Sequence, residues 1–241
     1  MSVENGEWIM HGLRRNAPDC IRTAAELTAL VDTLGFLPLF ACGVQGFSVE
    51  ERTVPGDWWT DDPGRDPWMW REQLAREGHV AYGKFFGGRA GFLSRKWFPV
   101  FANYRRDGYD FDALWEDEKA SLREKKIMDL FSDPATRLFS HEVKRMAGFM
   151  KGGEKNFDGT VTGLEMKTYL VMRDFRRRRN KQGQEYGWNL AIYARPEELF
   201  GYEQVTACYE EDPQASFARL VARAKELNPG AEEKQLVTLL K

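Results

Sequence analysis

The sequence contains few of the residues from which covalent or metal-bound frameworks are built. Its 241 residues include only three cysteines and three histidines, and no two cysteines form a Cys-x-x-Cys pair. Disulfide scaffolds and zinc sites both need closely spaced Cys or His side chains. We therefore expect no disulfide and no metal site, and we also expect no cofactor. The isolated thiols are Cys20, Cys42 and Cys208.

Long apolar runs and a surplus of one charge are also missing. No run approaches the roughly 18 apolar residues of a membrane-spanning helix. The first residues, MSVENGEW, lack the basic-then-apolar order of a signal peptide. These absences predict a cytoplasmic protein without a membrane segment. Because the net charge is −2, binding to phosphate would require basic residues that are gathered locally.

Apolar and aromatic residues, by contrast, are plentiful. Hydrophobic residues make up 42% of the chain and aromatic residues 13%, with eight tryptophans. This supply is enough for a sizeable core in one large domain or two small ones. Tryptophan and tyrosine serve both in cores and on surfaces that stack against bases.

The first half of the chain, residues 1–117, is rich in aromatics and contains two clear helix starts. A Thr23–Glu26 capping box and Gly35 delimit the first helix, and Asp66-Pro67 opens the second. Between them, residues 36–40 form an apolar run interrupted by proline, which favours a buried turn or a sheet edge. Residues 80–86 and 90–94 flank Gly87-Gly88 and predict a hairpin.

The second half follows a regular order of elements. Capping signals predict helices over residues 121–131 and 140–148, and a third apolar helical face covers 157–168. The period then changes to two in the arms 170–175 and 186–192, which flank a polar turn. Helix, helix, helix and hairpin in this order are typical of a winged helix-turn-helix.

We therefore predict an α+β fold that is mainly α with small β-hairpins. The predicted winged helix covers 118–205, and a helical tail covers 206–241. Whether residues 1–117 form a second winged helix, which would make the arrangement tandem, is left open.

The predicted wing is strongly basic. Six Lys and Arg residues lie within nine positions, against the single acid Asp174; they are Arg173, Arg176, Arg177, Arg178, Arg179 and Lys181. A wing lies beside the DNA backbone or minor groove, where such residues release counterions. Two interpretations stay open, namely contact with double-stranded DNA and a solvated hairpin tip that pairs with acidic loops of the same chain.

Further basic and aromatic residues could extend this surface. Lys151 and Lys155 precede the third helix, whose N-terminal amides could hold a phosphate, and Lys167 lies at its end. Lys84, Arg105 and Arg106 alternate with aromatic residues, a mixture that suits phosphate contact with base stacking. The stacking candidates are Trp68, Trp70 and Tyr82. A flexible turn in the first case, and core aromatics with a basic rim in the second, are the alternatives.

Candidates for chemistry are weaker. Asp57 and Asp66 lie close in sequence to four tryptophans, and a carboxylate against an aromatic wall can have a raised pKa and activate water. Gln73 is the other polar candidate. Nothing in their spacing requires catalysis.

Three segments of the first half resemble a known family. WMWREQL at 68–74, AYGKFF at 81–86 and RAGFLS at 89–94 resemble a pattern in winged-helix proteins related to the AlkZ-type DNA glycosylases. Residues 164–170 with 186–188 resemble the helix and wing of those proteins. The resemblance covers roughly residues 25–205, and it implies tandem winged-helix units, DNA binding and a link to base-excision or crosslink repair.

The resemblance also locates a place for catalysis. In the AlkZ-type enzymes a Gln-x-Gln motif near the first helix positions water for cleavage of the N-glycosidic bond. The corresponding residues here are 35–40, which contain no Gln. Three functions follow as hypotheses: a DNA-binding repair protein related to the glycosylases, a non-catalytic DNA-binding regulator, and a winged helix that binds an acidic protein partner.

Overall fold

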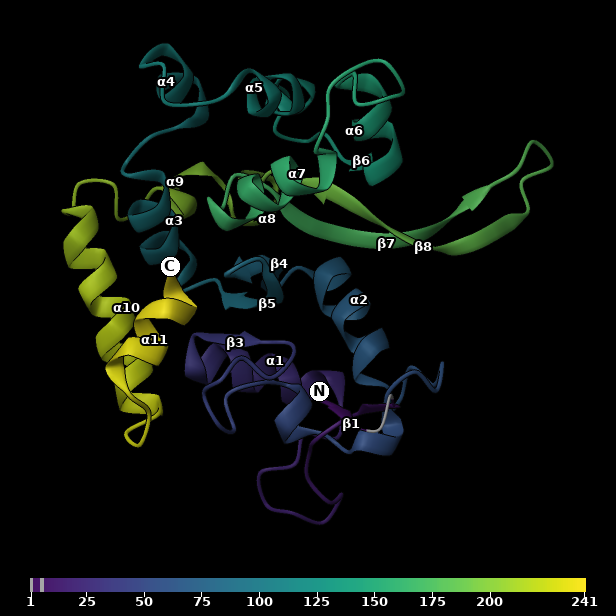
Figure 1. Ribbon diagram of the computed structural model, residues 1–241, viewed down its shortest axis with the longest axis vertical. Coiled ribbons are helices and arrows are strands. Elements are labelled where there is room, and N and C mark those ends of the chain that lie inside the picture. The colour runs from purple at the N-terminus through teal and green to yellow at the C-terminus, as the bar shows by residue number, and fades with distance from the viewer. Residues whose placement is uncertain (1, 5–6) are drawn as a thin grey trace.

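An antiparallel sheet of six strands runs through the centre of the molecule (Figure 1). The structure is a computed structural model that describes residues 2–4 and 7–241, with side chains from residue 9 onward. The strand order is β3-β5-β4-β7-β8-β6. The bounds of these strands are β3 Phe36–Pro38, β4 Val80–Phe86, β5 Arg89–Ser94, β6 Leu138–Phe139, β7 Val171–Arg179 and β8 Glu185–Ala194. A separate two-stranded sheet pairs β1 (Ser2–Glu4) with β2 (Glu7–Ile9).

The two predicted hairpins do not stand alone as small units. Strand β4 pairs with β7, with Tyr82 opposite Met172. This pairing joins residues from both sides of the predicted boundary at 117/118 in one sheet. The α+β class is confirmed, but the small separate hairpins are corrected to one continuous sheet. The apolar run with Pro38 is an edge strand of that sheet, as its proline indicated.

Helices of the first half begin where local capping signals place them. Thr23 Oγ1 accepts a hydrogen bond from the Glu26 N–H at 3.1 Å, at the start of α1 (Ala24–Leu34). Helix α2 (Pro67–Glu77) begins after Asp66, whose carboxylate accepts from the Trp68 N–H at 2.8 Å. At Gly35 the backbone has φ +99°, and a Cβ there would lie 2.4 Å from the Trp97 ring, so only glycine fits.

The second half contains the three predicted helices, α5 (Leu122–Met128), α6 (Ser140–Met146) and α7 (Phe157–Met166). Ser121 and Glu124 form the expected capping box of α5. The prediction that Ser140 caps α6 was wrong by one residue. Ser140 is already helical, and Glu142 instead accepts from the Phe139 N–H at 2.9 Å. A 3-10 turn, η3 (Asp129–Phe131), follows α5.

Several short helices were not predicted: η1 (Glu50–Arg52), η2 (Pro55–Asp57), α3 (Phe98–Arg106), α4 (Phe111–Glu116), α8 (Pro196–Phe200) and α9 (Tyr202–Val205). Helix α3 is the important one, because its residues from Phe98 to Asn103 are all buried. No side chain caps its N-terminus, so the sequence carries no capping signal for its start. Pro99 fits its first turn, where no backbone donor is needed.

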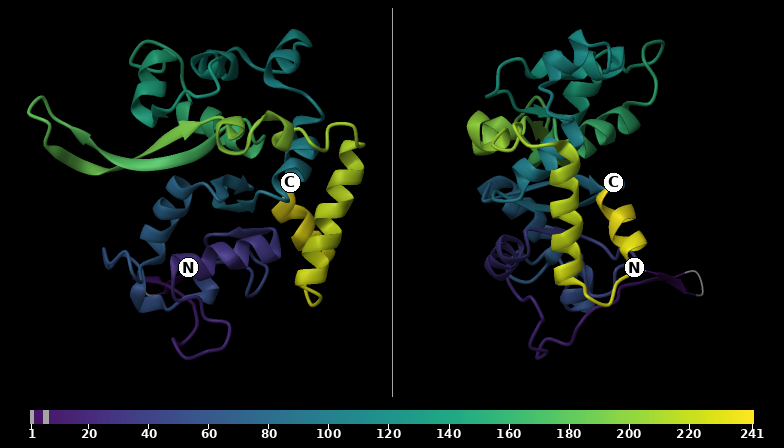
Figure 2. Two further views of the ribbon diagram at one scale, coloured as in Figure 1. Left: turned by 180° about the vertical axis from the view of Figure 1, so that it is seen from behind. Right: turned by 90° about the vertical axis from the view of Figure 1, so that its left-hand side faces the viewer.

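The C-terminal tail forms the predicted helices α10 (Pro213–Leu227) and α11 (Glu233–Leu240). They lie side by side on one flank of the molecule (Figure 2), and α10 packs against α3. Leu220, Leu236 and Leu240 are fully buried there and belong to the same hydrophobic cluster as the sheet. In the described part of the chain, no helix is long and apolar enough to cross a bilayer.

Candidate nucleic-acid interface

The hairpin formed by β7 and β8 projects from the body of the molecule (Figures 1 and 2). Every residue from Arg176 to Asn189 is exposed. The turn is closed by Asn180, whose side-chain oxygen accepts from the N–H groups of Gln182 and Gln184 at 3.0 and 2.9 Å. We call residues 176–189 the wing. It projects furthest from the body, and it carries five of the six residues of the predicted basic run 173–181.

The first basic residue of the segment, Arg173, fixes the base of the wing to helix α2. Its guanidinium donates hydrogen bonds to the carbonyls of Ala75 and Arg76 in the last turn of α2. Its Nε donates to Glu198 Oε2 at 3.1 Å. A cation at a helix C-terminus stabilises that helix end. Arg173 therefore positions the hairpin and is not free to contact a phosphate.

Asp174 neutralises the next basic residue. Its carboxylate is 2% exposed and accepts hydrogen bonds from Arg76 Nε at 3.0 Å and Arg176 Nε at 2.6 Å. Burial alone would raise the pKa of Asp174. The hydrogen bonds from Arg76, the Phe175 N–H and Arg176 outweigh burial and lower its pKa below the usual value. Asp174 is thus charged at neutral pH and holds the root of β7 to α2.

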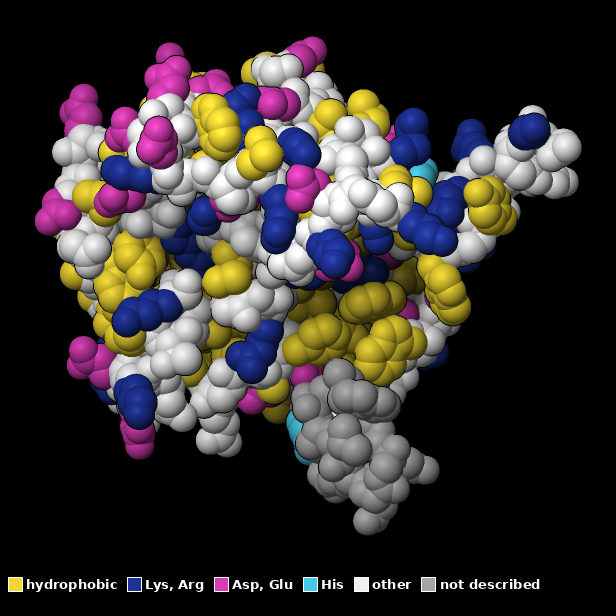
Figure 3. Space-filling view, turned by 45° about the horizontal axis from the view of Figure 1, so that its top comes forward, with side chains coloured by type: hydrophobic (Ala, Val, Ile, Leu, Met, Phe, Trp, Pro, Cys, Tyr) yellow, Lys and Arg dark blue, Asp and Glu magenta, His cyan; other side chains and the backbone are white. Residues whose placement is uncertain are grey.

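The unpaired cations lie beyond these anchors. Among the described residues, Arg177, Arg178 and Lys181 have no carboxylate partner, whereas Arg179 is 3.3 Å from Glu185. Figure 3 shows Lys and Arg side chains along the projecting wing, while acidic side chains gather at the far end of the same face. The protein therefore separates its charges although its net charge is close to zero.

A groove of about 420 Å³ lies between the wing and the start of α6. It is lined by Phe139, His141, Glu142, Arg176, Arg177, Arg178, Arg179, Glu185 and Tyr186. The His141 ring lies against Phe139, with centroids 5.3 Å apart, and its buried Nδ1 has no hydrogen-bond partner. Four arginines with two carboxylates give the groove a positive balance, which suits an anionic ligand.

Helix α7 carries the other predicted lysines at its two ends. Lys151 and Lys155 are exposed in the loop before it, where Glu154 is paired with Arg123 and Lys126. Lys167 Nζ lies 2.6 Å from Glu124 Oε1, so it joins α7 to α5. Lys151 and Lys155 are accessible for phosphate contact. Lys167 is engaged in an ion pair.

Three predicted contact residues are used inside the fold instead. Arg105 donates to the carbonyls of Met166 and Leu240, at 2.9 and 3.0 Å, and also to that of Phe85. Lys84 Nζ donates to Thr162 Oγ1 at 3.0 Å and is half-buried. Arg106 is 2% exposed. All three side chains are engaged by groups from distant segments of the chain, so we leave them out of the DNA-contact set.

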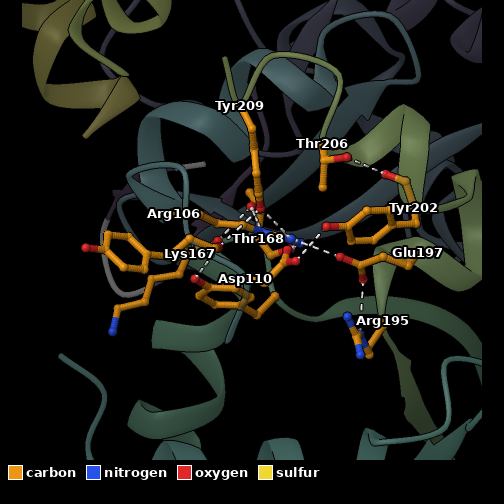
Figure 4. Close-up of polar contacts among 11 residues, drawn as sticks. Arg106, Asp110, Lys167, Thr168, Arg195, Glu197, Tyr202, Thr206 and Tyr209 are labelled. Carbon is orange, nitrogen blue, oxygen red and sulfur yellow. Dashed lines mark hydrogen bonds and ion pairs between the residues drawn. The ribbon is translucent and has the colours of Figure 1, made fainter. Parts of the chain in front are cut away.

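Arg106 is the centre of a buried polar network (Figure 4). It donates to Glu197 Oε1 at 2.9 Å, the Tyr209 hydroxyl at 3.0 Å and the Thr168 carbonyl at 2.7 Å. Its guanidinium lies 4.6 Å from the centroid of the Tyr169 ring. Burial alone would lower the pKa of Arg106, but the ion pair with Glu197 raises it above its usual range. The network ties α3, α8 and the tail to the turn between α7 and β7.

The predicted stacking residues are mostly inaccessible. Trp70 is 1% exposed and Tyr82 is 3% exposed, so both belong to the core. Trp68 is half-buried, and the Arg71 guanidinium already covers its ring at 3.7 Å. Two exposed aromatics that the sequence reasoning missed are on the wing, where Trp188 is 90% exposed and Tyr186 is 49% exposed. Their positions on the second arm of the predicted hairpin, opposite the arginines of the first arm, could have identified them.

The predicted acidic and amide candidates have structural partners. Asp57 forms an ion pair with Arg15, and Asp66, which is fully buried, accepts from the N–H groups of Thr60 and Asp61 in addition to capping α2. Gln73 Nε2 donates to Glu77 on the same helix at 2.8 Å. These contacts stabilise a loop and a helix. Among the described residues, no group of three or more His, Cys, Asp and Glu could hold a metal ion.

Comparison with known proteins gives one match. A family model described as AlkZ related matches residues 21–241. No curated protein and no solved structure matches the chain.

Proposed function

Because the chain belongs to the AlkZ-related family, we propose that it is a DNA-binding protein that contacts the duplex backbone with its wing. One observation carries this proposal. A chain with a net charge of −2 places three unpaired cations, Arg177, Arg178 and Lys181, on its most exposed hairpin. Surface cations without partners favour polyanions, because each contact with a phosphate releases counterions.

The order and pairing of elements in the second half support a winged helix. The order is α5, β6, α6, α7, β7 and β8, and the short strand β6 pairs with β8, which pairs with β7. In DNA-binding proteins of this kind the last helix of the trio and the hairpin lie next to each other on the duplex. The proposal therefore places α7, with Lys151 and Lys155 before it, beside the DNA.

The first half supports a second unit of the same kind. Its order is α1, β3, two 3-10 turns, α2, β4 and β5, and its strands pair in the order β3-β5-β4. This order repeats the β6-β8-β7 arrangement of the second half, again with the short first strand beside the last. We propose tandem winged-helix units that are joined through β4 and β7.

The residues of this chain support DNA binding but not cleavage of a base from the DNA. At the position that corresponds to the water-positioning motif, Phe36, Leu37 and Leu39 are fully buried and apolar. Asp57, Asp66 and Gln73 are engaged in structural contacts. A side chain that activates water must be polar and must be free to reach the substrate. We propose that the protein acts on alkylated or crosslinked DNA, as its resemblance to the AlkZ-type glycosylases implies, and that it does so as a binding component.

The first test measures binding to a short labelled duplex, plain and alkylated, at several salt concentrations. We expect affinity to fall steeply with salt. Arg177→Ala with Arg178→Ala should reduce the slope of log K against log salt by about 0.9 for each lost phosphate contact. The matched control is Arg219→Ala with Lys225→Ala on α10, which removes the same charge from the opposite flank.

Alkali treatment after incubation separates the remaining hypotheses. Strand breaks on the alkylated duplex alone would reveal a glycosylase and overturn the non-catalytic part of the proposal. Salt-insensitive binding, or equal slopes for the wing and control variants, would overturn the wing as a DNA contact. An absence of DNA binding would leave an acidic protein partner as the ligand of the wing.

A further inference from the structure

The most exposed large hydrophobic side chain of the described residues is Trp188, on the wing. It is 90% exposed, whereas Trp59 and Tyr186, which are also exposed, reach 49% each. A large apolar ring that is left in water loses the free energy that its burial would give. An exposed indole within a polar hairpin is therefore a contact residue for something that stacks.

A bulge in the hairpin presents this side chain. Arg176 pairs with Leu190 and Arg178 pairs with Tyr186, so Arg177 alone faces the three residues 187–189. Gly187, with φ +74°, adopts the left-handed conformation that glycine favours. Bulges bend a strand and redirect its side chains. The bulge thus turns the chain at the residue immediately before Trp188.

The residue after Trp188 is fixed to the body of the molecule. Asn189 Nδ2 donates to Glu72 Oε2 at 2.8 Å, and the other Glu72 oxygen accepts from Arg71 at 3.1 Å. On the opposite strand, Arg176 is held by Asp174. Trp188 therefore lies where the anchored root of the hairpin becomes the free wing. Because the backbone on either side of the ring is anchored, binding at Trp188 loses less backbone entropy than it would at the free tip.

Charge decides what the ring contacts. Arg177 lies opposite the bulge, and Arg178 and Lys181 continue toward the tip without carboxylate partners. Free cations around an accessible aromatic ring are the combination that holds bases and phosphates together in single-stranded nucleic acid. A purely apolar partner would leave these cations unpaired, so a nucleobase with its phosphates is favoured over an apolar protein surface.

We propose that Trp188 stacks on a nucleobase that has lost its pairing partner, so that the protein prefers DNA with unpaired bases to a fully paired duplex. The inference rests on the proposed DNA binding and adds the class of DNA that is preferred. In a paired duplex each base face is already stacked, and opening a step costs free energy. In mismatched DNA that cost is smaller.

The test compares a fully paired duplex with a duplex of the same length that carries a central mismatch bubble. We expect the wild type to prefer the bubble. Trp188→Ala should lose affinity for the bubble by roughly 5- to 150-fold, because base–aromatic stacking contributes about 1–3 kcal/mol per base. Trp188→Phe should keep part of the preference. Both variants should melt like the wild type, because the side chain is exposed.

Intrinsic fluorescence gives a second readout. Binding to the bubble should quench part of the tryptophan emission in the wild type and in Trp59→Phe, but not in Trp188→Phe. Equal preference for the bubble in the wild type and Trp188→Ala, with the salt slope unchanged, would overturn this inference and leave the proposed DNA binding intact. If the wild type showed no salt-dependent binding to either DNA, both this inference and the proposed DNA binding would be overturned.

Discussion

Glu165 lies on α7 with its carboxyl group in the interior, and its two oxygens have unequal surroundings. The side chain is fully buried, and Oε1 accepts from the Lys84 N–H at 3.2 Å, whereas Oε2 has no partner among the described residues. Burial raises the pKa of Glu165 to about 8, and Lys84 offsets only part of this effect. The carboxyl group is therefore neutral at pH 7, because an isolated buried charge is strongly unfavourable.

This shift has a defined direction in a stability measurement. The folded pKa lies above the ordinary value of 4.5, so folding takes up a proton between pH 4.5 and about 8. The free energy of unfolding should fall through this range, by at most about 1.4 kcal/mol per pH unit from this group. Glu165→Gln should remove that decline and gain stability relative to the wild type toward pH 8. Urea denaturation across the range measures it.

The control for this prediction is Glu203→Gln, which changes an exposed carboxyl group and should leave the pH dependence of the wild type unchanged. If Glu165→Gln and the wild type lost stability in parallel as the pH rises, the conclusion that the buried Glu165 carboxyl group is neutral would be wrong.

Arginine shows what could be read from the sequence at this scale. Arg177 and Arg178 are exposed as predicted, whereas Arg106 is buried. All three stand in basic segments that also contain aromatics. What distinguishes Arg106 is Glu197, which reaches it across 91 positions of sequence. Partners that distant leave no local pattern, so side-chain type alone could not separate a contact residue from a core residue.

At the scale of elements, local signals succeeded and non-local ones were invisible. The starts of α1, α2 and α5 depend on capping side chains within three residues, and all three were predicted correctly. The hairpins depend on alternation and on turn residues, and their arms were also found. The pairing of β4 with β7 places Tyr82 opposite Met172. Neither strand has a sequence pattern that identifies the other as its partner.

Helix α7 is notable for what its ten residues do not contain. Within Phe157–Met166 there is no Arg, Lys, Asn or Gln, the side chains that most often read base edges. Its exposed and half-buried residues are Asp158, Gly159, Thr160, Thr162, Gly163 and Met166. If the proposed winged helix places α7 against DNA, the helix offers shape and little base discrimination. The cations of the wing and of the loop before α7 then supply most of the affinity.

We therefore predict binding that is nearly independent of base sequence. Unlabelled duplexes of unrelated sequence should compete within about threefold of one another, whereas specific readers discriminate by 10³ or more. Asp158→Ala should raise affinity for every duplex modestly, because it removes a negative charge beside the phosphates. Competition titrations at fixed salt measure both effects. A single sequence that competes a hundredfold better would show that α7 reads bases after all.

At the scale of the whole molecule, the tail is part of the core. Arg105 donates to the Leu240 carbonyl at 3.0 Å, and Asn103 donates to the Glu211 carbonyl at 3.1 Å. Both donors lie on α3, which also packs against α10 through the stacked rings of Tyr104 and Phe217. Helix α3 in turn contributes Arg106, which donates to the Thr168 carbonyl in the turn that leads into β7. The tail therefore supports the position of elements in both halves.

A chain shortened to residue 205 should consequently not keep a stable fold. The truncation removes the fully buried Leu220, Leu236 and Leu240. It exposes the apolar face of α3 and removes both acceptors of the buried Asn103 amide, which costs about 1–3 kcal/mol. These losses together approach the 5–15 kcal/mol that stabilises a typical domain. Circular dichroism and thermal melting should show one cooperative transition for the full chain and none for the shortened one. A shortened chain that melts at the same temperature as the full chain would mean that the tail is an independent appendage, and that residues up to 205 hold the sheet and the wing in place without it.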